Sequence, residues 1–190
     1  MIEISSSKNP LIKEIKSLSR KKERWENQLF VMEGIKVIEE AIENKINIKN
    51  IIYSDRLLSI NEGMYFYDKV RDMKNLIHVN DKIFDEISGT VNSQCVLATG
   101  FFKPNSLDSI SNSSNQFLIF LNALQDPGNM GTIIRSADAF NINGIIIGEG
   151  CVDPYNPKVV RATMGSLFRM PLYFVRDDNN AINSLKNKGY

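Results

Sequence analysis

Apolar positions in the first hundred residues recur at two spacings, one typical of amphipathic helices and one typical of buried strands. Residues 10–24 carry an apolar stripe at helical spacing among many lysines and arginines, which predicts one basic amphipathic helix. The stripe consists of Leu11, Ile12, Ile15 and Leu18. Other helices are predicted over residues 35–42 and, after a cap at Asn80 or Asp81, as far as Ile87; strands are predicted over 29–32, 48–53, 76–79 and 94–98. We therefore expect a small α/β unit.

The rhythm changes after a polar stretch in the middle of the chain. Residues 103–116 are nearly all polar, small or turn-forming. Because such a segment buries little apolar area, we predict that it links two domains, residues 1–102 and 117–190. In the second part, strands are predicted at 117–121, 145–148 and 172–175, and helices at 129–140, 157–167 and 180–187. This alternation predicts a parallel sheet with crossover helices.

Composition argues against a zinc protein, a disulfide-rich protein and a membrane-spanning protein, but it does not indicate a function. The formal net charge is +1, so a surface for nucleic acid has to come from local clustering of charge. The only cysteines, Cys95 and Cys151, lack the spacing of a zinc site or a disulfide framework, and we expect no metal. No apolar run approaches the roughly 20 residues that cross a bilayer. We expect a soluble cytoplasmic protein without a membrane segment.

The polar corner after the strand at 117–121 is the first candidate site. Ligands of open parallel sheets bind outside the carboxyl ends of the strands. Gly128 and Gly131 permit the close approach of another backbone, and Asn129 is expected to cap the following helix. That helix is predicted to direct an apolar face, which includes Phe140, toward the sheet. Arg135 falls on the other side, where it is either a solvated surface residue or a ligand for phosphate.

A second polar corner, residues 148–157, leaves the next strand. The segment that follows carries Lys158, Arg161 and Arg169 and no acid, which indicates either an anion site or a solvated positive face. Gly148 and Gly150 do not complete a dinucleotide-binding fingerprint. Spacing alone leaves both interpretations of the basic segment open.

Two longer motifs carry a resemblance to a known family. The stretch NALQDPGNMGTIIRSADAF, residues 122–140, resembles the first signature of the SpoU or TrmH family of RNA ribose methyltransferases, in the SPOUT superfamily. NPKVVRATMGSLFRMP, residues 156–171, is similar to the second signature. FVMEGIKVIEEA and ISGTVNSQCVLA, at residues 30–41 and 87–98, resemble the small ribosomal-protein-like RNA-binding domain that precedes the methyltransferase domain in many members.

The resemblance implies a fold, an activity and partners. The fold would be a small RNA-binding α/β domain followed by a parallel-sheet domain of the SPOUT, trefoil-knot type. The activity would be transfer of a methyl group from S-adenosylmethionine to a ribose 2′-hydroxyl of RNA, with large-subunit ribosomal RNA as the expected substrate and a homodimer as the expected assembly. The glycines of the first corner would let RNA or a partner chain come close.

The resemblance also implies roles for individual residues. Arg135 and Asn129 would be catalytic, and Gly148 and Glu149 would contact the methyl donor. The residues expected to bind RNA are Lys13, Lys16, Arg20, Lys21, Lys22, Lys158, Arg161 and Ser166.

The sequence ends at Tyr190, before the third, C-terminal signature that supplies most of the donor pocket in the family. We therefore expect a SPOUT domain truncated at its C-terminus. Two other interpretations stay open. One is a non-catalytic RNA-binding protein or fragment built from the same parts, and the other is an α/β domain that binds a small molecule or nucleotide and has no role with RNA. Donor binding separates the first from the methyltransferase, and RNA binding separates both from the last.

Overall fold

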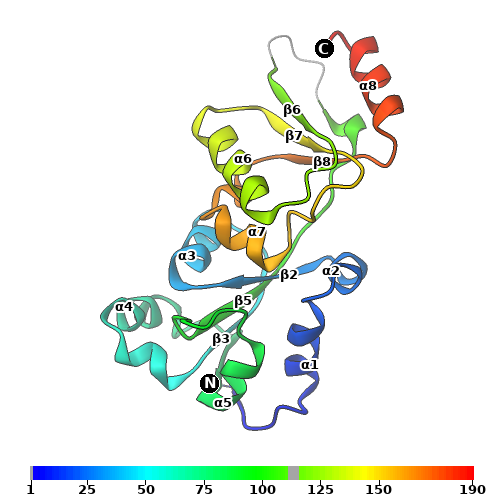
Figure 1. Ribbon diagram of the computed structural model, residues 1–190. Coiled ribbons are helices and arrows are strands. Elements are labelled where there is room, and N and C mark those ends of the chain that lie inside the picture. Colours follow the sequence, from blue (N-terminus) through cyan, green and yellow to red (C-terminus); the bar gives the residue numbers. More distant parts are fainter. Residues whose placement is uncertain (1, 111–115) are drawn as a thin grey trace.

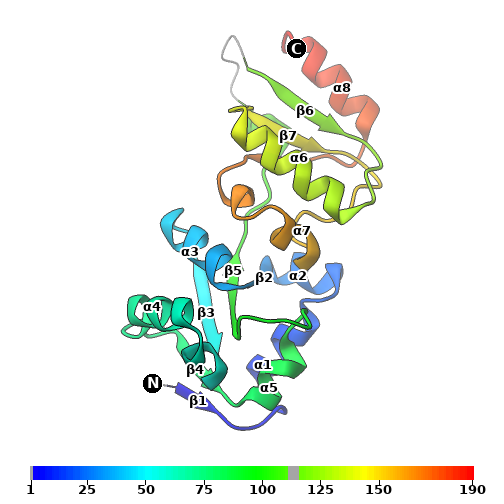
Figure 2. The same ribbon diagram turned by 60° about the vertical axis from the view of Figure 1, so that its left-hand side comes forward.

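A computed structural model describes residues 2–110 and 116–190, which form two α/β lobes joined end to end. The N-terminus lies in one lobe and the C-terminus at the far end of the other, as Figures 1 and 2 show from two sides. The described residues contain no helix that is long and apolar enough to cross a membrane. They also contain no group of three or more His, Cys, Asp or Glu side chains arranged to hold a metal ion.

The first lobe is a five-stranded sheet with helices packed around it. In chain order its elements are β1 (Ile2–Ile4), α1 (Pro10–Ser17), α2 (Lys21–Asn27), β2 (Leu29–Glu33), α3 (Ile35–Glu43), β3 (Ile48–Tyr53), η1 (Asp55–Ser59), α4 (Asn61–Val70), β4 (Leu76–Val79), α5 (Asp81–Ile87) and β5 (Val96–Phe101). The strand order is β1-β4-β3-β5-β2, with β1, β4 and β3 parallel and β5 antiparallel to both of its neighbours. The small α/β unit predicted from the sequence is thus present, with β1, η1 and α4 in addition.

The second lobe has the predicted parallel sheet. Its elements are η2 (Leu107–Ser109), β6 (Leu118–Leu121), α6 (Pro127–Ala139), β7 (Gly144–Ile147), α7 (Pro157–Ala162), η3 (Ser166–Phe168), β8 (Leu172–Phe174) and α8 (Asp178–Asn187). The strands follow one another in the order β6-β7-β8. Asn105 forms a bridge beside β8 at Tyr173, and Ile110 is buried against α8, so part of the predicted linker packs on this lobe. Residues 111–115 of that linker lie outside the described residues.

The basic helix predicted over residues 10–24 is two helices, which corrects the sequence-based expectation. Helix α1 ends after Ser17, and the backbone turns before α2 begins at Lys21. The Nη1 of Arg24 donates hydrogen bonds to the carbonyl oxygens of Leu18, at 2.7 Å, and Ser19, at 2.9 Å. These bonds satisfy carbonyl groups that a continuous helix would have used. The apolar periodicity did not reveal the break, because the stripe does not indicate that Arg20 adopts an extended backbone.

Three details of the second lobe also differ from the prediction. Helix α6 begins at Pro127 and is capped by Asp126, whose Oδ1 accepts a hydrogen bond from the backbone of Asn129 at 2.7 Å, so Asn129 is not the cap. Phe140 is 80% exposed and does not belong to the apolar face of that helix. Helix α7 ends at Ala162 because the chain turns into left-handed geometry at Met164, with a φ of +50°, and at Gly165, with a φ of +93°.

An aromatic cluster joins the two lobes. Tyr155, from the corner before α7, stacks on Phe102 with ring centroids 3.8 Å apart, and it also meets Phe30 of β2 at 5.3 Å. Trp25 of α2 contacts Phe174 of β8 edge to face at 4.9 Å. A single continuous core of buried residues therefore extends from one lobe into the other.

Candidate functional site

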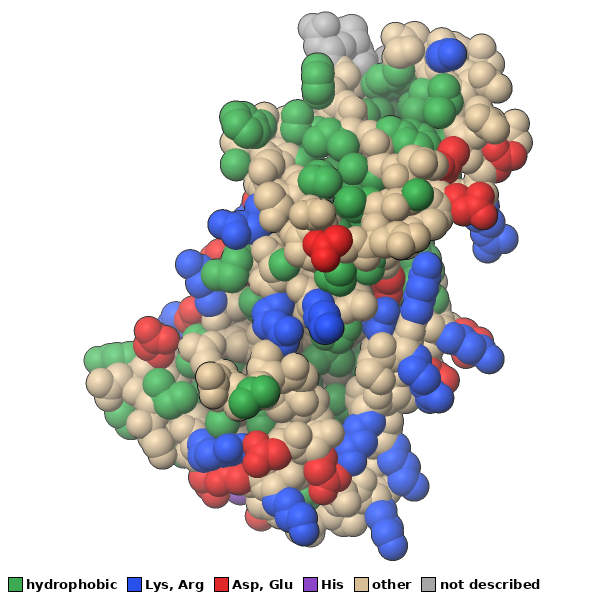
Figure 3. All heavy atoms as spheres, in the orientation of Figure 1, with side chains coloured by type: hydrophobic (Ala, Val, Ile, Leu, Met, Phe, Trp, Pro, Cys, Tyr) green, Lys and Arg blue, Asp and Glu red, His purple; other side chains and the backbone are tan. Residues whose placement is uncertain are grey.

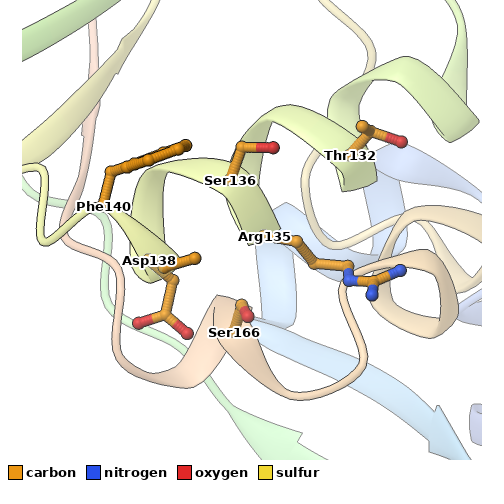
Figure 4. A pocket seen from close by; sticks show the side chains of 7 residues that line it. Thr132, Arg135, Ser136, Asp138, Phe140 and Ser166 are labelled. Carbon is orange, nitrogen blue, oxygen red and sulfur yellow. The ribbon is translucent and has the colours of Figure 1, made fainter.

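Arg135 lines a cavity of about 500 Å³ on the surface of α6. We call it the Arg135 cavity. It is lined by Thr132, Arg135, Ser136, Asp138, Ala139, Phe140 and Ser166. The side chain of Arg135 is exposed, and in Figure 4 it extends from α6 beside the turn that carries Ser166. Among the described residues, no carboxylate lies within ion-pair distance of it. A guanidinium that is charged and unpaired can receive a phosphate with two or more donors.

Asp138, which lines the Arg135 cavity, belongs to a set of ion pairs. The Nη2 of Arg169 lies 2.8 Å from Asp138 Oδ2, and its Nη1 lies 2.5 Å from Glu40 of the first lobe. The hydrogen bond from Arg169 is the main cause that lowers the pKa of Asp138 below its ordinary value, and a hydrogen bond from Ser166 acts in the same direction. Asp138 is thus an ionised structural partner of Arg169, and among the described lining residues of the cavity Arg135 is the cation without an ion-pair partner.

Helix α6 is held unusually close to α7. A Cβ at Gly131 would lie 2.4 Å from the Cβ of Ala162 and 3.0 Å from its carbonyl carbon. The missing side chain of Gly131 therefore makes room for α7 of the same chain. This corrects the expectation that both glycines of this corner make room for RNA or a partner. The close contact sets how far Arg135 on α6 lies from Ser166, which follows α7.

A larger cavity lies between the lobes, at the carboxyl ends of β7 and β8. This interdomain cavity, of about 790 Å³, is lined by Lys21 and Trp25 of α2 and by residues 104–106, 147–154 and 174–176. Its volume lies within the range of about 300–1,000 Å³ that is usual for small-molecule sites. Its position at strand ends is the usual one for ligands of parallel sheets.

Gly148 and Glu149 line the interdomain cavity, but both of their backbone N–H groups and the carbonyl of Glu149 already form hydrogen bonds. The N–H of Gly148 donates to Leu121 O at 2.8 Å, and the N–H of Glu149 donates to Asp178 Oδ1 at 3.0 Å. The carbonyl of Glu149 accepts from Ala123 at 3.0 Å. The exposed carboxylate of Glu149 is the charged group that this pair offers to a ligand. Arg135 and Asn129 do not line this cavity, so the structure places the predicted catalytic and donor-binding residues apart.

The basic residues predicted to bind RNA divide into paired and unpaired side chains. Ion pairs are formed by Lys16 with Glu86 at 2.5 Å, Arg20 with Glu23 at 3.2 Å, Lys22 with Glu26 at 3.7 Å and Arg161 with Glu33 at 3.8 Å. In the part of the chain that the structure describes, Lys13, Lys21 and Lys158 are exposed and have no acid within that distance. Ser166 is buried.

Figure 3 shows lysine and arginine side chains gathered along the edge that α1 and α2 form and around the waist between the lobes. The same view shows a second lobe that is mainly apolar or neutral. Charge is therefore concentrated in spite of a net charge of only +1. Asp138 and Glu40 are residues of this region that sequence reasoning missed, because nothing in the basic segment at 158–169 indicates which acids lie opposite it.

Comparisons with known proteins identify both lobes. Residues 9–98 match the MRM3-like substrate binding domain, and residues 116–190 match the SpoU rRNA Methylase family. A crystal structure of an rRNA methyltransferase from Sinorhizobium meliloti is 31% identical and superposes with a TM-score of 0.81 over 98% of this chain and 70% of that one. The chain belongs to the SpoU rRNA methylase family.

Curated relatives of this SpoU family chain agree with the assignment. It is 30% identical over 175 residues to the 23S rRNA (guanosine(2553)-2′-O)-methyltransferase RlmP of Bacillus subtilis, covering 90% of this chain and 64% of that protein. It is 33% identical over 148 residues to human mitochondrial rRNA methyltransferase 3, covering 75% and 34% respectively. The chain thus spans less than two thirds of the length of these relatives. The resemblance to the SpoU family and the expected fold are confirmed.

Proposed function

We propose that this protein transfers a methyl group from S-adenosylmethionine to a ribose 2′-hydroxyl of ribosomal RNA. The observation that carries the proposal is the free, exposed guanidinium of Arg135 at the mouth of a cavity on α6, in the segment that resembles the first family signature. RlmP supports the choice of a large-subunit ribosomal RNA and of ribose 2′-oxygen chemistry through the activity in its name. A solved form of the S. meliloti protein with AdoMet bound supports the methyl donor.

Arg135 is the group that acts on the ribose in this proposal. Its cationic guanidinium holds the phosphate next to the target nucleotide by charge-assisted hydrogen bonds. The same positive charge favours loss of the 2′-hydroxyl proton, because it stabilises the oxyanion that forms. Asn129, exposed in the first turn of α6, is proposed as a second polar contact to the substrate.

The interdomain cavity is proposed as the place of the methyl donor. Its size suits a cofactor, and it combines the Glu149 carboxylate with the aromatic rings of Trp25 and Phe174, groups that suit a sulfonium and an adenine ring. When bound, S-adenosylmethionine supplies an electrophilic methyl group. Gly148 and Glu149 then form one wall of its site, and RNA approaches over the lysines of α1 and α2.

The separation of Arg135 from the interdomain cavity favours a homodimer. In one copy the two groups line different cavities, so a second copy would have to bring an Arg135 to the donor. Complementation tests this arrangement. If Arg135→Ala and Glu149→Lys chains are each inactive, a one-to-one mixture of the two should regain about a quarter of wild-type activity through mixed dimers. Mixtures that stay inactive while forming mixed dimers would argue against a shared site.

The activity itself is tested with tritiated S-adenosylmethionine and ribosomal RNA that lacks the modification. We expect label in RNA, located at a dinucleotide that survives alkaline hydrolysis, because cleavage needs a free 2′-hydroxyl. The matched variant is Arg135→Lys, which keeps the charge and loses the planar fork. RNA binding without transfer in wild-type protein would favour the non-catalytic alternative. Free Cys95 and Cys151 support a reducing, cytoplasmic location, which cell fractionation would check.

A further inference from the structure

A buried ion pair ties the first lobe to the second. Arg24 of α2 and Asp153, in the corner between β7 and α7, have side chains that are only 2% and 3% exposed. Arg24 Nε donates to Asp153 Oδ2 at 2.7 Å, and its Nη2 lies 2.6 Å from the same oxygen. The two residues are 129 positions apart in the chain.

Each nitrogen of the Arg24 guanidinium and each oxygen of the Asp153 carboxylate has a hydrogen-bond or ion-pair partner. The remaining nitrogen, Nη1, holds the carbonyl oxygens of Leu18 and Ser19 at the end of α1, as described above. Asp153 Oδ1 accepts the backbone N–H of Tyr155 at 3.1 Å. One guanidinium therefore connects α1, α2 and the corner of the second lobe. Removal of either partner would leave an uncompensated buried charge.

The need to hold the lobes together does not by itself explain a charged pair here. The contacts of Tyr155 with Phe102 and of Trp25 with Phe174 already bury apolar area at this junction. A buried ion pair contributes little net stability compared with apolar residues of the same size, because desolvation offsets the attraction. What an arginine–carboxylate pair adds is a fixed relative orientation of the two side chains, since the planar guanidinium fits a carboxylate in few orientations.

We infer that Arg24 and Asp153 are positioning residues that fix the basic face of α1 and α2 against the interdomain cavity. Lys13 and Lys21 lie on these helices, and Lys21 also lines that cavity. Asp153 lines it from the other side, in the same corner as Gly148 and Glu149. The pair thus sets the distance between RNA bound by the first lobe and the proposed site of methyl transfer. This inference rests on the proposed function for its catalytic consequence, but not for its geometry.

Two variants separate orientation from charge. Arg24→Lys keeps the charge but cannot bind Asp153 and both carbonyl oxygens at once. Arg24→Met combined with Asp153→Asn removes both charges, while the asparagine oxygen can still accept from Tyr155. The control is Lys69→Met with Glu39→Gln, which removes an exposed ion pair between α4 and α3 inside the first lobe.

The first readout is geometric and needs no activity. Spin labels at Glu62→Cys on α4 and Lys186→Cys on α8, with Cys95 and Cys151 replaced by serine, report the distance between the lobes. We expect one narrow distribution for wild type and the control, and a distribution at least about twice as wide for Arg24→Lys and for the double variant. Circular dichroism confirms that each variant is folded. Wild-type width in both test variants would overturn the inference.

The second readout separates RNA binding from transfer in a form of the protein that transfers methyl groups. For both test variants we expect the dissociation constant for ribosomal RNA to change by less than about threefold. The rate at saturating RNA and donor should fall at least about tenfold, because small misplacements of reacting groups have large effects on rate. An unchanged saturating rate, or a loss confined to RNA affinity, would overturn the role. If wild type transfers no methyl group, the proposed function fails and the distance distribution alone decides this inference.

Discussion

Replacement of Gly131 by alanine should destabilise the second lobe, although alanine is the better helix former. The new Cβ would lie 2.4 Å from the Cβ of Ala162 and 3.2 Å from its Cα. Carbon atoms in contact normally lie about 3.5–4.0 Å apart, so α6 and α7 would have to separate by about 1 Å. Overpacking of this kind costs about 1–3 kcal/mol, and alanine returns about 1 kcal/mol of helix propensity.

The expected net loss is about 0–2 kcal/mol, which corresponds to a fall of up to about 1 M in the urea midpoint. Gly128→Ala in the same helix is the matched control, because its Cβ would meet only the side-chain oxygen of Asp126, at 3.1 Å. Adding Ala162→Gly to Gly131→Ala removes the closest clash. The two changes should therefore couple favourably by about 1 kcal/mol in a double-mutant cycle. A Gly131→Ala protein as stable as the control, with no coupling, would refute the packing argument.

The remaining predictions concern charge. Arg135→Ala should lower methyl transfer about 100-fold or more and change stability by less than about 1 kcal/mol, since the side chain is exposed; near wild-type transfer by a folded variant would remove Arg135 from the mechanism. Replacing both Lys13 and Lys21 by alanine should flatten the log–log salt slope of RNA binding by about 1.4–1.8, measured by titration at several salt concentrations. An unchanged slope would place the RNA surface elsewhere. Because the pKa of Asp138 is lowered in the folded protein, its ion pair contributes stability above about pH 4, and this contribution is lost as pH falls through the folded pKa. Asp138→Asn should therefore weaken the acid dependence of the melting temperature, and an identical dependence would contradict the assignment.

Helices and strands whose apolar residues recur at a regular spacing could be predicted from the sequence. Strands β3 and β4 have the predicted bounds, and the strand and helix alternation of the second lobe was predicted from the runs at 117–121, 145–148 and 172–175. Helix α4 was missed because Asn61–Val70 mixes glycine, tyrosine and charged residues over a weak apolar stripe. Periodicity finds an element only when most of one face is apolar.

Contacts between distant parts of the chain were beyond the reach of pattern reasoning. The carbonyl oxygens at the break after Ser17 are bound by Arg24, whose carboxylate partner is Asp153 in the other lobe. The early end of α7 falls where Met164 and Gly165 adopt positive φ. Gly165 is a signal that the sequence contains, but Met164 is not, and the apolar pattern predicts a helix as far as residue 167. Arg135 lies exposed at a cavity and its catalytic role stays a prediction, whereas the separation of Arg135 from Gly148 followed only from the fold.

The arginines of the second motif illustrate why a count of basic residues overestimates an RNA surface. Arg161 and Arg169 stand in a segment without acids, yet Glu33 and Glu40 of the first lobe lie at 3.8 and 2.5 Å from them. An arginine already paired with a carboxylate displaces few counterions from RNA unless that pair opens, which makes it a weak contributor to salt-dependent binding. We therefore propose that Lys13, Lys21 and Lys158, which have no acid within ion-pair distance among the described residues, attract phosphate more strongly than the paired arginines, which hold the first lobe against the lobe that carries Arg135. On this proposal one positive segment is divided into Lys158, which would meet RNA, and Arg161 and Arg169, which orient the first lobe.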